Sequence, residues 1–262
     1  VNASSSFAKP PRLEDLEMAK YRQAGFGIGV LTKLGSFHYP GAGSNGEVEQ
    51  SAWRVIRPID EVVSEVKEME QRFDLRKVFF IDNGFNIPLD HAKSFCRALL
   101  NADLKLHWNT CLAPHNCDLE LVQLMKQSGC ALVLMTGLSG EADSGVPFGE
   151  ALDRLEEVCH VCEDGDLHYS ITQVFGVPGE TSESVEQKLS FLRRINPALA
   201  NLRVGMRMLP GSEVAALARR EGIISDEAEL VQPRFYVADS VRDWIVDHLQ
   251  EQARPQPRWN VL

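Results

Sequence analysis

Residues 167–195, LHYSITQVFGVPGETSESVEQKLSFLRRI, carry the pattern that predicts the fold of this chain. The first nine residues are rich in apolar, aromatic and β-branched types, which favours a strand. Glycines at positions 176 and 179 then mark a turn. After the turn, Thr181 or Ser182 stands ahead of a glutamate, as in the capping box that begins a helix, and apolar residues follow at helical spacing. The stretch therefore predicts one strand–turn–helix unit.

This unit recurs about six times along the chain. We expect strands at residues 27–33, 77–82, 104–110, 130–136, 167–175 and 202–209, and helices at residues 58–73, 89–102, 118–129, 149–165, 181–195, 212–222 and 240–253. Alternation of this kind predicts a parallel sheet with right-handed crossovers. Six units are too few for a closed eight-stranded barrel. The pattern therefore favours an α/β fold that is either a partial (β/α)6 barrel or a doubly wound sheet.

The composition excludes two classes of partner. The net charge of the 262 residues is −10 with histidine neutral, whereas nucleic-acid-binding proteins normally present a basic face. No run of 18 apolar residues is present, so we expect no membrane-spanning segment. No signal-peptide pattern follows the first residue, and we expect a cytoplasmic protein or a piece of a longer one. A small-molecule substrate is the expected ligand, and a partner enzyme or a homodimer is the other association that we consider.

Six cysteines are scattered along the chain, at positions 96, 111, 117, 130, 159 and 162. Most lie in apolar periodic segments, where cysteine behaves as a small hydrophobic residue. Cys159 and Cys162 form a C-x-x-C pair near the end of an expected helix, but no second pair accompanies it. Zinc and iron–sulfur sites normally need further ligands at matching spacing, so we interpret the pair as structural.

The carboxyl ends of the six expected strands are polar or rich in glycine. Since parallel strands bring these ends to one edge of the sheet, we interpret them as the lining of a ligand pocket. The alternative is that loops are polar in any protein. The ends are Thr32 and Lys33, residues 82–86, Asn109 and Thr110, residues 136–141, residues 176–181, and Arg207.

The turn FGVPGET, residues 175–181, has further features of a ligand-binding turn. Gly176 and Gly179 permit a positive φ or a close backbone approach. The helix that follows presents free N–H groups, which attract anions. Glu180 lies where it could accept a hydrogen bond from a ribose or an amine. The alternative is a capped turn that only starts a helix.

Taken together, these segments resemble the radical S-adenosylmethionine superfamily, in particular the subgroup that is often fused to a cobalamin-binding domain. The resemblance covers nearly the whole chain and rests on the order and spacing of several motifs. They are TKLG at 32–35, VIRPIDEVVSEV at 55–66, IDNGFN at 81–86, FGVPGET at 175–181, MLPGSEVAALARREGII at 208–224 and VQPRFY at 231–236. The resemblance implies a partial (β/α)6 TIM-like barrel of the radical-SAM type.

The loop after the first strand departs from that family. There, the loop carries Cys-x-x-x-Cys-x-x-Cys, which holds a 4Fe–4S cluster. In this sequence the same register places Ser36, Pro40 and Gly43 at the three positions. Iron–sulfur clusters are held by thiolates, so we expect no 4Fe–4S cluster and no 5′-deoxyadenosyl radical. Cobalamin is likewise not expected in this chain.

The resemblance implies that S-adenosylmethionine still binds at the strand ends, as a substrate or cosubstrate. Its sulfonium is an electrophile, so methyl transfer, aminocarboxypropyl transfer, or elimination and cyclisation remain open. These reactions need a positioned nucleophile or base. The catalytic candidates are Lys33, His38, Tyr39 and Asp82; the candidates for S-adenosylmethionine are Thr136, Ser139, Gly176, Pro178, Gly179, Glu180, Thr181 and Arg207; the candidates for the substrate are Asn83, Phe85, Asn86 and Asn109.

Two other interpretations compete with a polar, S-adenosylmethionine-dependent enzyme. The chain could be a non-catalytic pseudoenzyme or scaffold for an active biosynthetic enzyme, or a true radical enzyme whose cluster is held by other cysteines. As to organisation, residues 1–26 are expected to be an arm or a linker remnant. Residues 27–225 are expected to form the partial barrel, with residues 226–262 as a carboxyl-terminal extension packed on it.

Overall fold

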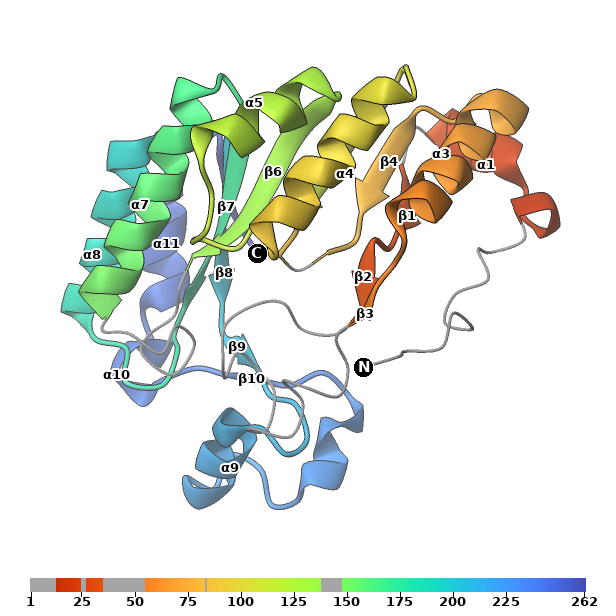
Figure 1. Cartoon of the computed structure of the whole chain (residues 1–262). Coiled ribbons are helices and arrows are strands. Elements are labelled where there is room, and N and C mark those ends of the chain that lie inside the picture. Colours follow the sequence, from red (N-terminus) through yellow and green to blue (C-terminus); the bar gives the residue numbers. More distant parts are fainter. Residues whose placement is uncertain (1–12, 25–26, 35–54, 83, 138–147) are drawn as a thin grey trace. The chain divides into compact units, whose positions relative to one another are not determined.

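The computed structural model describes residues 13–24, 27–34, 55–82, 84–137 and 148–262. The chain has an α/β fold whose main sheet contains seven parallel strands in the order β1-β4-β5-β6-β7-β8-β11 (Figure 1). The expected parallel α/β sheet is thus confirmed. The seventh strand, β11 (Trp259–Val261), was not expected; it pairs with β8 (Leu199–Val204) at the edge of the sheet.

The described residues fall into two compact units. The first comprises residues 13–24, 27–34, 55–82, 84–133 and 161–168, and the second comprises residues 134–137, 148–160 and 169–262. β6 (Cys130–Gly137) and α7 (Phe148–Asp164) contribute residues to both units. The domain boundaries expected at residues 26 and 225 stay a prediction.

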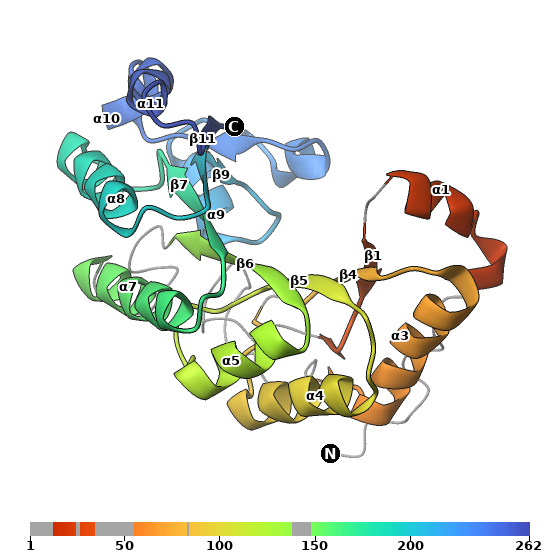
Figure 2. The same cartoon turned by 90° about the horizontal axis from the view of Figure 1, so that it is seen from above.

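The first unit packs three helices against one face of its strands, as Figure 2 shows for α3, α4 and α5. Its core is aromatic: the ring centroids of Phe80 and Phe95 are 5.0 Å apart, and those of Phe80 and Trp108 are 5.2 Å apart. On β4, Val78 and Phe80 are buried, because alternate strand residues point to the same face. The elements are η1 (Leu13–Asp15), α1 (Met18–Ala24), β1 (Ile28–Val30), β2 (Lys33–Leu34), β3 (Val55–Ile56), α3 (Ile59–Phe73), β4 (Lys77–Phe80), α4 (Leu89–Asn101), β5 (His107–Cys111) and α5 (Leu119–Gln127).

The second compact unit contains the strand–turn–helix segment of residues 167–195, and its strand and helix lie where the sequence predicts them. They are β7 (Tyr169–Phe175) and α8 (Ser182–Ile195). The segment continues through β8 into a separate two-stranded antiparallel sheet, β9–β10. The remaining elements are β9 (Met206–Arg207), α9 (Glu213–Arg220), η3 (Glu227–Val231), β10 (Phe235–Tyr236), α10 (Asp239–Arg242) and α11 (Ile245–Ala253).

The single strand expected at residues 202–209 is therefore wrong in one respect. The main-sheet strand ends at Val204, because Gly205 adopts φ +86° and turns the chain away. A side chain could not replace this glycine, since its Cβ would lie 2.9 Å from the Cβ of Phe235. Arg207 consequently lies on β9 and not at the end of a main-sheet strand.

Cys159 and Cys162 are fully buried on α7, among the apolar core residues. None of the helices in the described part combines the length and apolarity that crossing a bilayer requires.

Candidate functional site

In the first unit, the ammonium group of Lys33 is enclosed by backbone carbonyls. Its Nζ donates to the carbonyl oxygens of Gly84 at 2.7 Å, Phe85 at 3.0 Å and Ile87 at 2.7 Å. Lys33 is only 3% exposed. The ammonium group has three protons, which it directs to these carbonyls and to the nearby carboxylate of Asp82. Lys33 therefore ties the end of β1 to the loop that follows β4.

Asp82 lies beside this cage and completes the connection. Its carboxylate accepts hydrogen bonds from the Thr32 backbone N–H, at 3.2 Å, and from the Thr32 hydroxyl. One oxygen of Asp82 lies 3.7 Å from Nζ of Lys33, and Asp82 is buried. The two ends of neighbouring strands are thus held by a buried carboxylate and a buried cation.

Burial lowers the pKa of Lys33 from 10.5 to about 8, although the charge and hydrogen bond of Asp82 act in the opposite direction. At neutral pH the ammonium form still dominates, and that is the form which the three carbonyls require. Lys33 was predicted to be catalytic. To act as a base, Lys33 would first have to lose a proton that it donates to a carbonyl in a hydrogen bond. The contacts in the structure therefore give Lys33 the role of positioning the loop.

His91 is a candidate that the sequence analysis missed. It lies in the first turn of α4, and its Nε2 is buried with no hydrogen-bond partner among the described residues. Burial lowers the pKa of His91, and the positive charge of Lys33 lowers it further, against the raising effect of Asp82. The imidazole is therefore neutral at physiological pH and able to take a proton. The sequence signal was a histidine in the turn directly after the polar strand end at 82–86.

Two predicted substrate residues hold the structure together. Phe85 is 1% exposed and packs on Trp108, with ring centroids 5.2 Å apart. The Nδ2 of Asn86 donates to the carbonyls of Ala113, at 3.0 Å, and His115, at 2.5 Å, and its Oδ1 accepts from the Ala113 N–H at 2.9 Å. Both side chains are fully engaged by protein groups, because they join the loops after β4 and β5.

Asn109, on β5, is different. Its Oδ1 is buried and has no hydrogen-bond partner within the described ranges, so it keeps an unused acceptor. This residue remains a candidate for contact with a ligand N–H or O–H.

In the second unit, the turn between β7 and α8 has the expected conformation. Gly176 has φ +78° and Gly179 has φ +77°. Thr181 caps α8 and accepts from the Ser184 N–H at 3.2 Å. The reciprocal partner in the capping box is Ser184, not a glutamate, because Ser184 occupies the third position of the helix.

Glu180 is the centre of a buried network behind this turn. Its Oε2 accepts from Nζ of Lys188 at 2.5 Å and from the Gly176 N–H at 3.2 Å, while its Oε1 accepts from the Ser184 hydroxyl. Nζ of Lys188 also donates to the Val174 carbonyl at 3.0 Å. Glu180 was predicted to bind a ribose or an amine; the structure shows it fixing the turn from inside.

The remaining predicted residues are dispersed. Thr136 is exposed on β6, Pro178 is half-buried in the turn, Thr181 and Gly179 are exposed, and Arg207 is exposed on β9. His38, Tyr39, Asn83 and Ser139 lie outside the described residues, as do Ser36, Pro40 and Gly43.

Four cysteines in the described part of the chain have thiols with a raised pKa. Burial raises the pKa of Cys96 and of Cys117 to about 12 in each case, and it also raises the pKa of Cys111 and of Cys130. In the part of the chain that the structure describes, no three His, Cys, Asp or Glu side chains are grouped to hold a metal ion.

We compared the sequence and the fold of this chain with those of known proteins. No family model matches the chain. Tryptophan 2-C-methyltransferase from Streptomyces laurentii is 23% identical over 222 residues, which is 77% of this chain and 36% of that protein. A solved structure of the radical S-adenosylmethionine methyltransferase TsrM from Kitasatospora setae, with tryptophan substrate and the analogue aza-SAM bound, matches with a TM-score of 0.74 at 16% identity. It covers 93% of this chain and 55% of that chain. The chain has the radical S-adenosylmethionine fold.

The radical S-adenosylmethionine fold confirms the resemblance drawn from the motifs. A second neighbour is the cobalamin-dependent S-adenosylmethionine radical enzyme OxsB, with a TM-score of 0.54 at 11% identity over 75% of this chain and 36% of that chain. An uncharacterised methyltransferase from Pyrococcus horikoshii is 20% identical over 191 residues, 71% of this chain and 41% of that protein. The chain thus spans about a third to a half of the length of these relatives.

Proposed function

We propose that this chain binds S-adenosylmethionine and uses it as an electrophile in a polar reaction, best supported as methyl transfer, without an iron–sulfur cluster. The observation that carries the proposal is the likeness over 93% of the chain to a methyltransferase that was solved with an S-adenosylmethionine analogue. The sequence relatives are also methyltransferases. A second TsrM structure contains cobalamin and a [4Fe–4S] cluster. The proposed reaction of this chain differs from that arrangement in using no cluster.

The absence of cysteine from residues 31–54 supports the polar reaction. Reductive cleavage of a sulfonium needs an electron, and the loop of this chain offers no thiolate to hold the cluster that would deliver it. Attack on the methyl carbon of the sulfonium needs no electron source. It needs a nucleophile aligned with the C–S bond and a group that removes the proton of that nucleophile.

The turn before α8 supports binding of the nucleoside. Gly179 is exposed, and no heavy atom lies within 4 Å of the place where its Cβ would be. The backbone at Gly179 therefore faces open space two residues ahead of Thr181, which caps a helix of 14 residues. A ligand can approach such a backbone closely, whereas the N–H groups of Glu180 and Thr181 already donate to the Val177 carbonyl and the Ser184 hydroxyl. Glu180 contributes indirectly, because it holds the turn in shape.

His91 supports the presence of a base. It is neutral, and its Nε2 has no protein partner among the residues described. We assign it the removal of a proton from the substrate nucleophile, and we assign Asp82 and Lys33 the positioning of the strand ends beside it. The roles expected for His38 and Tyr39 stay part of the proposal.

A binding titration with S-adenosylmethionine, combined with elemental analysis for iron and cobalt, tests this function. The purified chain should bind the ligand and contain neither metal, even after anaerobic reconstitution. Incubation with methyl-labelled S-adenosylmethionine and candidate acceptors should give S-adenosylhomocysteine and a labelled product without a reductant. Formation of 5′-deoxyadenosine that depends on dithionite would restore the radical interpretation.

One observation favours a second candidate, a non-catalytic partner of an active enzyme. Lys33 and Glu180, two of the titratable residues that were expected to face a ligand, are both engaged in internal contacts. A scaffold keeps such contacts and needs no proton transfer. If the chain forms no product from S-adenosylmethionine but raises the activity of an enzyme with which it co-purifies, the scaffold function holds.

A further inference from the structure

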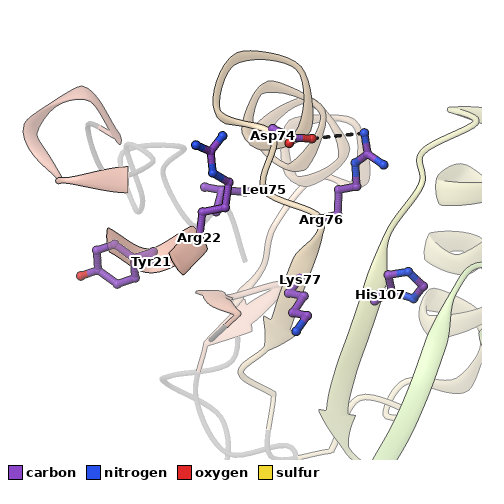
Figure 3. A pocket seen from close by; sticks show the side chains of 7 residues that line it. All are labelled: Tyr21, Arg22, Asp74, Leu75, Arg76, Lys77 and His107. Carbon is purple, nitrogen blue, oxygen red and sulfur yellow. Dashed lines mark ion pairs between the residues drawn. The ribbon is translucent and has the colours of Figure 1, made fainter. Parts of the chain in front are cut away.

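The first unit has a hollow of about 300 Å³ at the amino ends of β4 and β5 (Figure 3). This is the opposite end of these strands from Asp82 and Thr110, so the hollow is distinct from the candidate site. Its lining comes from α1, from the loop between α3 and β4, and from the first residues of β4 and β5. These residues are Tyr21, Arg22, Asp74, Leu75, Arg76, Lys77 and His107.

The strand register brings basic side chains together here. Lys77 and His107 are the first residues of neighbouring parallel strands and are register partners, so their side chains leave the same face of the sheet. The His107 N–H donates to the Arg76 carbonyl at 2.7 Å, which fixes the two strand starts. Arg22 faces this loop from α1, as Figure 3 shows. Leu75, which is buried, lies beneath them.

The charge of the hollow is opposite to that of the chain as a whole. Among the lining residues that the structure describes, Arg22, Arg76 and Lys77 are cationic, and the one carboxylate is Asp74, 3.1 Å from a guanidinium nitrogen of Arg76. The lining therefore has an excess of two positive charges in a chain of net charge −10. Arg22 forms no ion pair with another residue in the described ranges. A local positive potential inside an acidic protein directs anions to that place.

The carboxyl end of α3 also reaches this hollow, and exposed carbonyls there would repel an anion. Two of its last carbonyls are already occupied. The Asp74 N–H donates to the Glu70 carbonyl at 3.0 Å, and the Leu75 N–H donates to the Met69 carbonyl at 3.1 Å. These two bonds reduce the repulsion of an anion at the helix end, where the three cationic side chains of the lining oppose what remains of it.

We propose that this hollow binds a small phosphate-bearing molecule, the size of a sugar phosphate, at a site separate from the S-adenosylmethionine site. A guanidinium group binds a phosphate through two parallel hydrogen bonds, and Arg22 is the group available for this. Lys77 and His107 add a cation and a hydrogen-bond donor, and Tyr21 contributes a hydroxyl. The volume lies at the small end of the range for ligand pockets. Because the lining is mostly exposed, solvent screens the charges, and we expect a dissociation constant of about 0.1–1 mM at low salt.

Isothermal titration with ribose 5-phosphate tests the proposal, with ribose as the unphosphorylated control. A sugar phosphate is chosen because it lacks the adenine that S-adenosylmethionine carries. Arg22→Gln should weaken binding about fivefold to twentyfold, which is the effect of losing one charge-assisted pair. The matched control is Arg97→Gln, since Arg97 is an exposed arginine of the same unit that pairs with Glu120 away from the hollow. It should bind like the unchanged protein.

Binding should persist in the presence of saturating S-adenosylmethionine, because the hollow lies at the amino ends of β4 and β5, whereas Asp82 and His91 follow the carboxyl end of β4. The proposal is overturned if ribose binds as well as its phosphate, if Arg22→Gln and Arg97→Gln have equal affinity, or if no saturable binding appears up to about 10 mM. Loss of binding on adding S-adenosylmethionine would place the phosphate in the candidate site and would also overturn it. None of these outcomes bears on whether the chain transfers a methyl group.

Discussion

The ammonium nitrogen of Lys33 lies 3.7 Å from a carboxylate oxygen of Asp82, and both side chains are buried at the carboxyl ends of adjacent strands. Neither residue is isolated: Lys33 holds three carbonyls of residues 84–87, and Asp82 holds Thr32 by its backbone and its hydroxyl. Asp82 and the Thr32 that it holds are 50 positions apart in the sequence. The pair therefore acts as a long-range connection that shapes the edge of the first unit where His91 and Asn109 have unused polar atoms.

Replacing Lys33 by methionine should lower the free energy of unfolding by about 3–5 kcal/mol, because three buried carbonyls and a buried carboxylate lose their partner. Urea denaturation followed by circular dichroism measures this. Lys67→Met is the matched control, since Lys67 is exposed on α3, and it should change stability by less than about 0.5 kcal/mol. Equal stability of the two variants would show that the carbonyl cage does not contribute.

The stability of the chain should respond to pH through Lys33. The pKa in the folded state, about 8, is lower than the unfolded value of 10.5, so between these two values the unfolded chain binds more protons. The contribution of Lys33 to stability therefore rises with pH across this window, by up to about 3 kcal/mol. Urea titrations at successive pH values between 8 and 10.5 should show a smaller rise in Lys33→Met than in the unchanged protein. Parallel curves would contradict the depressed pKa.

The pair of Glu180 and Lys188 should show strong coupling. Glu180→Gln or Lys188→Met alone leaves a buried charge unpaired and should cost about 3–5 kcal/mol, whereas the double variant should recover part of this loss. A double-mutant cycle in urea measures the coupling. If the two losses simply add, the ion pair is not the cause.

Gly179→Val should weaken the binding of S-adenosylmethionine at least tenfold, because the side chain enters the open space beside the turn. It should also lose about 1–2 kcal/mol of stability, since φ is +77° there. Gly222→Val is the matched control: Gly222 has φ +74° and open space around it, so it should lose similar stability and keep its affinity. A similar loss of affinity in both variants would assign the effect to stability alone.

His91→Ala should lower methyl transfer by about 10²- to 10⁴-fold while the affinity for S-adenosylmethionine changes little, if His91 is the base. In the unchanged protein, activity should fall as pH drops through the pKa of His91, which lies below 6.5. His160→Ala, at an exposed histidine on α7, is the control and should keep full activity. If His91→Ala leaves the rate unchanged, His91 is not the base, and the base is expected among the residues outside the described part.

Local structure could be predicted because its causes lie within a few residues. Thr181 caps α8 through a contact three residues away, and Asp118 caps α5 through Leu121 in the same manner. The strand at 169–175 and its glycine turn follow from β propensity and from positive φ angles, and both are local properties. The order of such units also determined the parallel α/β fold.

Only the tertiary structure decided what the polar strand ends do. Lys33 and Glu180 both suggested a ligand in the sequence, yet their partners are carbonyls 51 to 54 residues away and a lysine eight residues on, beyond one helical turn. β11 is too short to be recognised by pattern and becomes a strand because β8 offers an unpaired edge. A buried charged group pairs with the polar groups that tertiary packing brings next to it, since leaving the charge unpaired costs several kcal/mol. The sequence alone determined which groups reach the strand ends, and packing determined which of them are left for a ligand.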